Sequence, residues 1–274
     1  MKCLTRLIAG SALLLAVTPL AQATVFFSDT FGSGSTLNSA TPAAPTASSA
    51  SYQLVSSKSW VPTPTIASGN LKFGIAATSA GHIEAQALFA SSPVSLVQVG
   101  DYVRLTVVFT NTAGMLTAAN TFLGIGLYNS TQVQPVAGGL NGTAVNSQTG
   151  NTTGGVQNWQ GYWAQISYSG QSSRILTRPA QTSGPDNRNQ DLVTTGSGSQ
   201  SYATPGGANV SANTNALLVL TNGNVYTAVL TINLNDVNSL GITNTLYEGP
   251  TTNGTLRVML GGVATNTTLL HRRF

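Results

Sequence analysis

The chain has 274 residues, of which 41% are hydrophobic and only 7% are charged. Its eleven Lys and Arg residues form no cluster larger than Arg272-Arg273, so the basic footprint that nucleic-acid binding requires is missing from the sequence. One Cys and two His also leave too few nitrogen and sulfur ligands for a zinc site.

The first predicted element is an export signal. Lys2 and Arg6 flank the start of the chain, an apolar run follows at 7–17, and a small-x-small pattern ends at Ala23. This layout is typical of a Sec-type signal peptide, because the apolar run is too short to span a membrane. We expect cleavage after Ala23 and a secreted, periplasmic or cell-surface location.

We expect residues 24–274 to form a single domain without a transmembrane segment. The one cysteine of the chain, Cys3, leaves with the signal peptide, so neither a disulfide nor a thiolate remains. Nine basic and seven acidic residues are left, a net charge of about +2. Ser, Thr, Asn, Gln and Gly must therefore solvate most of the surface.

Strand signals dominate the rest of the chain, as short runs of β-branched and aromatic residues bounded by Gly, Asn, Pro and Ser. We predict strands at 71–78, 82–90, 101–112, 121–130, 216–222, 225–235 and 255–262. Asn222-Gly223 predicts a tight hairpin turn, since this dipeptide accommodates positive φ. No window carries a helical apolar stripe over three turns, and we expect 236–242 to form one helical turn at most. Many short strands without helices between them predict an all-β antiparallel sandwich or barrel.

The clearest alternation lies within 101–112. Two sets of side chains alternate along this run: Tyr102, Arg104, Thr106 and Val108 in one set, and Val103, Leu105, Val107 and Phe109 in the other. Such a period of two predicts a strand with two different faces.

Several phrases occur together, among them "GNLKFGIAATSAGHIEAQALFA" at 69–90, "GDYVRLTVVFTNT" at 100–112 and "VQNWQGYWAQI" at 156–166. With these phrases the chain resembles a group of poorly characterised exported proteins from Verrucomicrobia-type Gram-negative bacteria, many of which carry a PEP-CTERM sorting tail. The resemblance implies a concanavalin-A-like (laminin-G-like) jelly roll, an antiparallel β-sandwich of two packed sheets. It implies no activity.

The end of the chain differs from this group. The last residues, "GGVATNTTLLHRRF", contain no Pro-Glu-Pro motif followed by an apolar span and a basic cluster. We expect a prematurely terminated reading frame that lacks a closing strand and leaves a sheet edge open. The alternative is a natural short terminus.

Carboxylates are few for a glycan hydrolase, which needs two of them around the scissile bond. The clustered Glu-x-Asp-x-x-Glu strand of laminarinase-like jelly-roll glycosidases is absent, and Glu84 stands alone on its predicted strand. His82 and His271 are isolated, so a Ser-His-Asp triad is not indicated. These observations favour a non-enzymatic protein, with a hydrolase or lyase that uses Glu84 as the alternative.

One polar loop, "GPDNRNQDL" at 184–192, suggests a metal site. Asp186, Asn187, Asn189 and Asp191 offer the hard oxygen ligands that Ca²⁺ prefers. The alternative is that these side chains only satisfy turns, as Asp and Asn commonly do in loops. No other cofactor is expected.

The most distinctive stretch is "VQNWQGYWAQISYSG", which holds two of the three tryptophans. In a strand, Trp159, Trp163 and Gln165 would share one face, and Tyr162 would point to the other. Flat apolar rings beside an amide are typical of a sugar-stacking surface. We therefore predict a ligand site at Trp159, Tyr162, Trp163 and Gln165.

The alternative is that both tryptophans fill the core and that Gly161 relieves the crowding between them, since Trp is usually well buried. The sequence thus favours an exported, non-enzymatic β-sandwich that binds polysaccharide or belongs to an extracellular matrix or cell surface. A glycan-active hydrolase or lyase and a purely structural surface protein remain as alternatives.

Overall fold

The computed structural model describes residues 23–32, 51–56, 65–72, 74, 83–90, 92–112, 122–129, 160–168, 173–178, 220–265 and 272–274. Within these ranges every regular element is a β-strand, every ladder is antiparallel and no helix occurs. The predicted all-β antiparallel class is confirmed for this part of the chain. In the described ranges there is accordingly no helix long and apolar enough to cross a membrane.

The larger sheet has four strands in the order β11-β10-β9-β5. These strands are β5 (Tyr102–Thr110), β9 (Val225–Asp236), β10 (Ser239–Glu248) and β11 (Thr255–Ala264). Two hairpins connect β9, β10 and β11, so neighbours in the chain are also neighbours in the sheet. Strand β5 is distant in sequence and pairs with the free side of β9.

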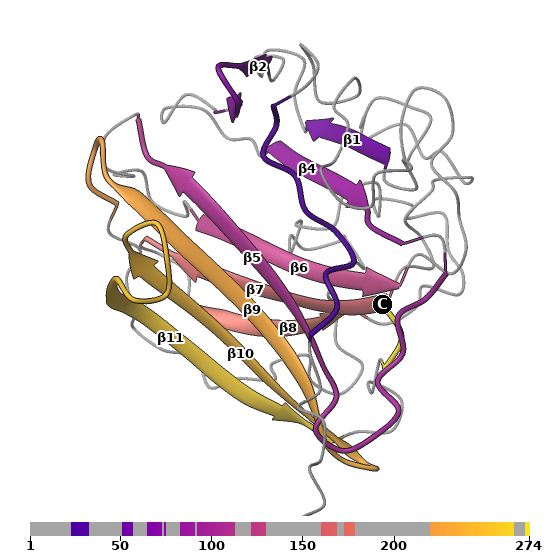
Figure 1. The fold of residues 1–274 in the computed structure, drawn as a ribbon. Helices are drawn as coiled ribbons and strands as arrows, with labels where there is room; N and C mark the ends of the chain where they lie inside the picture. The colour runs from indigo at the N-terminus through magenta and orange to yellow at the C-terminus, as the bar shows by residue number, and fades with distance from the viewer. Residues whose placement is uncertain are drawn as a thin grey trace, which may run out of the picture.

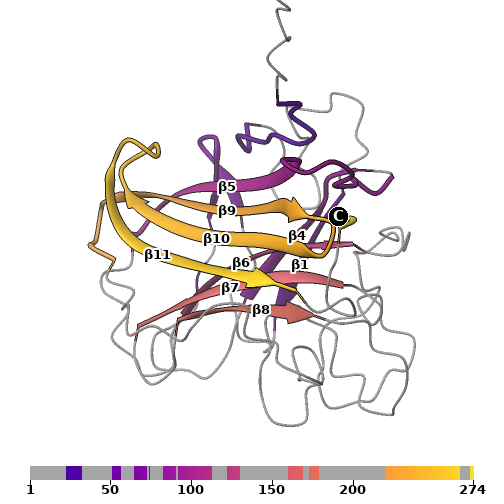
Figure 2. The same cartoon turned by 90° about the horizontal axis from the view of Figure 1, so that it is seen from below.

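The second sheet has three strands in the order β6-β7-β8. Its members are β6 (Phe122–Asn129), β7 (Gln160–Ser167) and β8 (Arg174–Arg178). Figures 1 and 2 show this sheet stacked face to face with the four-stranded sheet. Two further ladders join β1 (Ser51–Ser56) to β4 (Ile83–Leu88) and β2 (Thr65–Ala67) to β3 (Asn70–Lys72).

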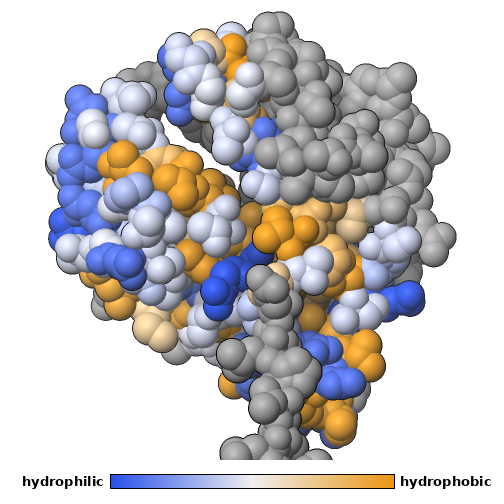
Figure 3. Space-filling view, in the orientation of Figure 1, coloured by the Kyte–Doolittle hydropathy of each residue, from blue (hydrophilic) through white to orange (hydrophobic). Residues whose placement is uncertain are grey.

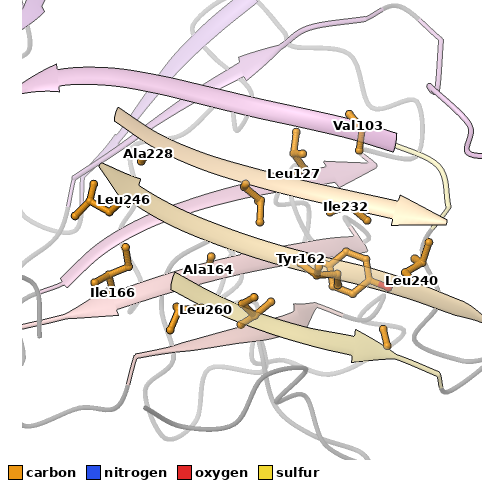
Figure 4. Close-up of a cluster of buried hydrophobic side chains, with 14 of the residues drawn as sticks. Val103, Leu127, Tyr162, Ala164, Ile166, Ala228, Ile232, Leu240, Leu246 and Leu260 are labelled. Atoms are coloured by element: carbon orange, nitrogen blue, oxygen red, sulfur yellow. The ribbon is translucent and has the colours of Figure 1, made fainter. Parts of the chain in front are cut away.

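One hydrophobic core fills the space between the two larger sheets (Figure 4). The four-stranded sheet contributes Leu230, Ile232 and Leu246, and the three-stranded sheet contributes Tyr162 and Ile166. In each strand the core residues are two apart, because successive side chains of a strand point to opposite faces. Burial of this shared face is what holds the two sheets together.

The turns around β9 follow the sequence signals in one case and contradict them in another. The chain turns at Asn222-Gly223, where Gly223 has φ of 81°, so the predicted turn is confirmed, but residues 220–222 lie in no strand and the described residues show no hairpin there. The expected helical turn at 236–242 is wrong. Val237 and Asn238 form the tip of the β9–β10 hairpin, and strand β10 begins immediately afterwards. Asp236 stabilises this tip by accepting hydrogen bonds from the Asn238 N–H (2.7 Å) and the Ser239 hydroxyl (2.6 Å).

The last three residues return to the core. A bridge joins Ser95 to Arg273, and the backbones of Val94 and Phe274 exchange hydrogen bonds of 2.6 and 2.9 Å. The Phe274 ring is only 4% exposed, and its centroid lies 6.4 Å from that of Tyr162. Residues 272–274 therefore tie a segment that precedes β5 to the core between the sheets.

Candidate functional site

Strand β7 carries the stretch that the sequence singles out, and its two faces differ as predicted. Tyr162, Ala164 and Ile166 belong to the core between the sheets. Trp163 belongs to a separate cluster with Leu176. The predicted parity is therefore confirmed: Trp163 and Tyr162 lie on opposite sides of the three-stranded sheet.

The side of this sheet that turns away from the core carries four apolar residues, which we call the tryptophan face: Phe122, Tyr128, Trp163 and Leu176. The Phe122 ring meets the indole edge to face, with centroids 5.6 Å apart. Trp163 also lies over Gly124, where an added Cβ would come within 2.8 Å of indole Cε2. Gly124 thus provides the space that the indole needs.

A polar row continues this face beyond Trp163. The Gln165 amide donates to the Ser167 hydroxyl (2.6 Å), and the Ser173 hydroxyl accepts from the Ser167 N–H (3.0 Å). Arg174 lies opposite Gln165 in the ladder. Burial lowers the pKa of the Arg174 guanidinium below its ordinary value, because burial disfavours the charged form.

Trp163 and Leu176, in the middle of the tryptophan face, are covered, while Phe122 and Tyr128 are partly buried. Trp163 is only 1% exposed, and the side chains of Gln165 and Tyr162 are fully buried. A sugar ring can stack only on an exposed aromatic face, so in this conformation Trp163 does not form an open platform. Tyr162 packs between the sheets, where it cannot share a ligand with Trp163. Trp159 lies outside the described residues.

An exposed aromatic ring, which a stacked sugar requires, lies on the opposite side of the molecule. On the outer surface of the four-stranded sheet, Tyr102 is 46% exposed, and the Arg104 guanidinium lies 5.2 Å from the centre of its ring. Arg104 Nε donates to the Thr231 hydroxyl on β9 (3.2 Å), and Asn233 pairs directly with Tyr102 across the ladder. We call these four residues the outer patch.

The outer patch is part of a broad surface with little charge. Figure 3 shows orange hydrophobic atoms among near-neutral and strongly hydrophilic ones over this sheet. The exposed apolar side chains that contribute to it come from β5 and β11: Tyr102, Val108, Leu256, Met259 and Val263. The sequence contained a signal for the patch, because Tyr102 and Arg104 alternate with the apolar set that faces the core.

Asp29, Asp101 and Asp236 accept hydrogen bonds from backbone N–H groups, and Glu248 forms an ion pair with Arg257. Asp101 accepts from the Val97 and Gln98 N–H groups (2.7 and 2.8 Å), and the bond from Gln98 and then that from Val97 hold the pKa of Asp101 below its ordinary value. Hydrogen bonds from the Arg257 guanidinium likewise lower the pKa of Glu248. These hydrogen bonds favour the ionised form of both carboxyls.

The remaining predicted sites are located as follows. Glu84 lies in β4 opposite Val55. The predicted Ca²⁺ ligands Asp186, Asn187, Asn189 and Asp191, and the histidines His82 and His271, lie outside the described residues. Within the described ranges no three His, Cys, Asp or Glu side chains converge on a point where a metal could bind.

The chain matches no protein-family model, no curated protein and no solved structure.

Proposed function

We propose that this is an exported, non-enzymatic β-sandwich protein that binds polysaccharide at the cell surface or in an extracellular matrix. The observation that carries the proposal is the outer patch, in which the 46%-exposed ring of Tyr102 lies beside Arg104, Thr231 and Asn233. An aromatic ring offers a flat apolar surface to a sugar, while guanidinium, hydroxyl and amide groups bind its hydroxyls.

The position of the patch suits a long ligand. Its residues lie on strands rather than on loops, so the neighbouring strands hold them at fixed spacing. Arg104 is oriented by two partners, the Tyr102 ring and the Thr231 hydroxyl, which lowers the entropy that a ligand must remove from it. The surrounding surface carries little charge and would repel neither a neutral nor a weakly acidic polysaccharide.

The sequence supports the same assignment. The signal-peptide layout of the first 23 residues and the resemblance to exported bacterial proteins favour a location outside the cytoplasm. We further propose that the two stacked sheets belong to a concanavalin-A-like jelly roll, since both are antiparallel and enclose one core.

Binding to polysaccharide is measured by affinity electrophoresis and by pull-down on insoluble glucans and chitin. Tyr102→Ala should weaken binding at least about tenfold, as expected for the loss of one stacking contact of about 1.4 kcal/mol. Val108→Ala is the matched control, since Val108 is exposed on the same strand and face. Unchanged binding in Tyr102→Ala would overturn the assignment of the patch.

Two further variants separate the alternatives. Loss of binding in a folded Trp163→Phe protein, with Tyr102→Ala unaffected, would place the ligand on the tryptophan face as the sequence predicts. Turnover of a polysaccharide that Glu84→Gln abolishes would contradict the non-enzymatic proposal and favour a hydrolase or lyase. If neither binding nor turnover is found, the alternative of a purely structural surface protein is favoured.

A further inference from the structure

Arg104 is exposed and carries a positive charge that no carboxylate in the described part of the chain neutralises. Its Nε donates to the Thr231 hydroxyl (3.2 Å), and its guanidinium lies 5.2 Å from the centre of the Tyr102 ring. The ion pair between described residues is that of Arg257 with Glu248, in which Arg104 takes no part. Arginine has five N–H groups, so four of those of Arg104 remain for a ligand.

The two contacts hold the guanidinium of Arg104 in an orientation that suits a carboxylate. Because Nε is bound to Thr231, the edge formed by Nη1 and Nη2 remains for a second acceptor. Two parallel N–H groups on one edge match the two oxygens of a carboxylate, and hydrogen bonds between such ionised groups are about twice as strong as those between neutral ones. A hydroxyl of a neutral sugar would occupy only part of this edge.

On the outer surface of the sheet, no acidic side chain of a described residue lies beside Arg104. The nearest acid in the sequence, Asp101, is bound by the backbone N–H groups of Val97 and Gln98. The outward positions around Arg104 on β5 and β9 are uncharged: Tyr102, Thr106, Val229, Thr231 and Asn233. An anion at Arg104 therefore meets neither a competing carboxylate nor a repelling one there.

A row of hydroxyl-bearing and small residues leads from Arg104 across the four strands, which lie side by side in Figure 1. Thr231 pairs with Arg104, and Thr243 pairs with Thr231 on one side and with Gly261 on the other. A Cβ at Gly261 would have Thr243 Cγ2 as its nearest neighbour, at 3.8 Å, so the surface is open at this end of the row. Neighbouring strands are about 4.8 Å apart, so the row extends for about 14 Å and has room for several sugars of a chain.

We propose that the polysaccharide bound at the outer patch is acidic, and that Arg104 binds the carboxylate of a uronic acid while the adjoining sugar stacks on Tyr102. The rest of the polymer crosses the strands over Thr231 and Thr243 toward Gly261. The inference rests on the proposed function and adds the substrate class to it. Charge complementarity names the occupant, because a neutral polymer would leave the guanidinium without a counter-charge.

The test compares polygalacturonate and alginate with their methyl esters, which have the same backbones without the charge. Isothermal titration calorimetry measures dissociation constants for the full chain at low and at high NaCl concentration. At low salt, wild type should bind the acidic polymers at least about tenfold more tightly than the esters. Most of this preference should be lost at high salt, because salt screens exposed charges. Equal binding of acid and ester at low salt, or binding of neither, overturns the proposal.

Variants of Arg104 separate a contact with the ligand from a structural role. Arg104→Gln should lower the affinity for the acidic polymers at least about tenfold and that for the esters less than about twofold, whereas damage to the fold would weaken both equally. Arg104→Lys keeps the charge without the bidentate edge and should give an intermediate affinity. Arg273→Gln removes the same charge from an exposed position outside the patch and should bind like wild type. An Arg104→Gln protein that keeps the preference for acid overturns the proposal.

The outcomes also distinguish this proposal from the function on which it rests. If Tyr102→Ala weakens binding of acid and ester alike while Arg104→Gln weakens neither, the proposed function stands and the acidic substrate class falls. If Tyr102→Ala leaves all binding unchanged, the outer patch is not the site and both fall. Dextran sulfate is the sulfated probe. If it binds as tightly as polygalacturonate and depends equally on Arg104, the site accepts any polyanion and the assignment of a uronic acid is overturned.

Discussion

At the scale of single residues, Asn244 is the exception in an otherwise apolar layer. It lies on the inner face of β10, between Leu230 of β9 and Leu260 of β11, and is 1% exposed. Its Oδ1 finds no hydrogen-bond donor in the described part of the chain. A buried amide oxygen without a donor costs free energy that an apolar side chain of similar size avoids.

Replacement of this amide should therefore stabilise the protein. Asn244→Leu is expected to raise the free energy of unfolding by about 1–2 kcal/mol, measured by urea denaturation. Thr245→Leu, on the outer face of the same strand, should change it by less than about 0.5 kcal/mol. A fall in stability in Asn244→Leu would show that the amide is satisfied in solution.

Gly124 gives a second prediction at this scale, with the opposite sign. A Cβ there meets the Trp163 indole, which is itself enclosed, so Gly124→Ala should lower the free energy of unfolding by about 1–3 kcal/mol. The matched change Gly74→Ala adds a Cβ in open space and should be neutral or slightly stabilising. Equal stability of the two variants would contradict this prediction, because it would mean that the Trp163 indole can shift to make room for the added Cβ.

At the scale of elements, acidic side chains close the connections around the four-stranded sheet. Asp101 holds the turn before β5, Asp236 holds the β9–β10 hairpin, and Glu248 joins β10 to β11 through Arg257. Hydrogen bonds lower the pKa of all three carboxyls. The main donors are Gln98 for Asp101, Ser239 for Asp236 and Arg257 for Glu248.

These shifts predict the response to acid. A carboxyl whose pKa is lower in the folded state stabilises that state above its unfolded pKa of about 4, and loses this contribution as pH falls through the folded value. Stability should thus be level from neutral pH down to about pH 5 and decline below about pH 4. In the Arg257→Ala variant, stability should decline less steeply with falling pH. The measurement is the melting temperature at a series of pH values. An equally steep decline would contradict the role of the Glu248–Arg257 pair.

Sequence patterns located the elements well where one strand face is apolar throughout. The strands predicted at 101–112, 121–130, 225–235 and 255–262 are confirmed as β5, β6, β9 and β11 with small differences at their ends. Strand β10 was missed because the polar Asn244 interrupts its inward apolar set. Strand β8 was missed because it is short and has an arginine at each end.

At the scale of the whole molecule, the two larger sheets are held by one core, and Phe274 reaches it from the last position of the sequence given. Phe274→Ala should lower the free energy of unfolding by about 3 kcal/mol, because it leaves a cavity beside Tyr162. Arg273→Ala, at an exposed neighbouring position, is the control and should be nearly neutral. Differential scanning calorimetry compares the two, and equal melting temperatures would contradict the packing of Phe274.

The sequence by itself determined the all-β class and placed Trp163 and Tyr162 on opposite faces of their strand. Both follow from a period of two, which is a local property of the backbone. The tertiary structure alone decided that Trp163 is enclosed while Tyr102 is exposed, and that β5 pairs with β9 across more than a hundred residues of chain. These outcomes depend on which distant strands pack against a face or pair with an edge, and alternation within one strand carries no information about that.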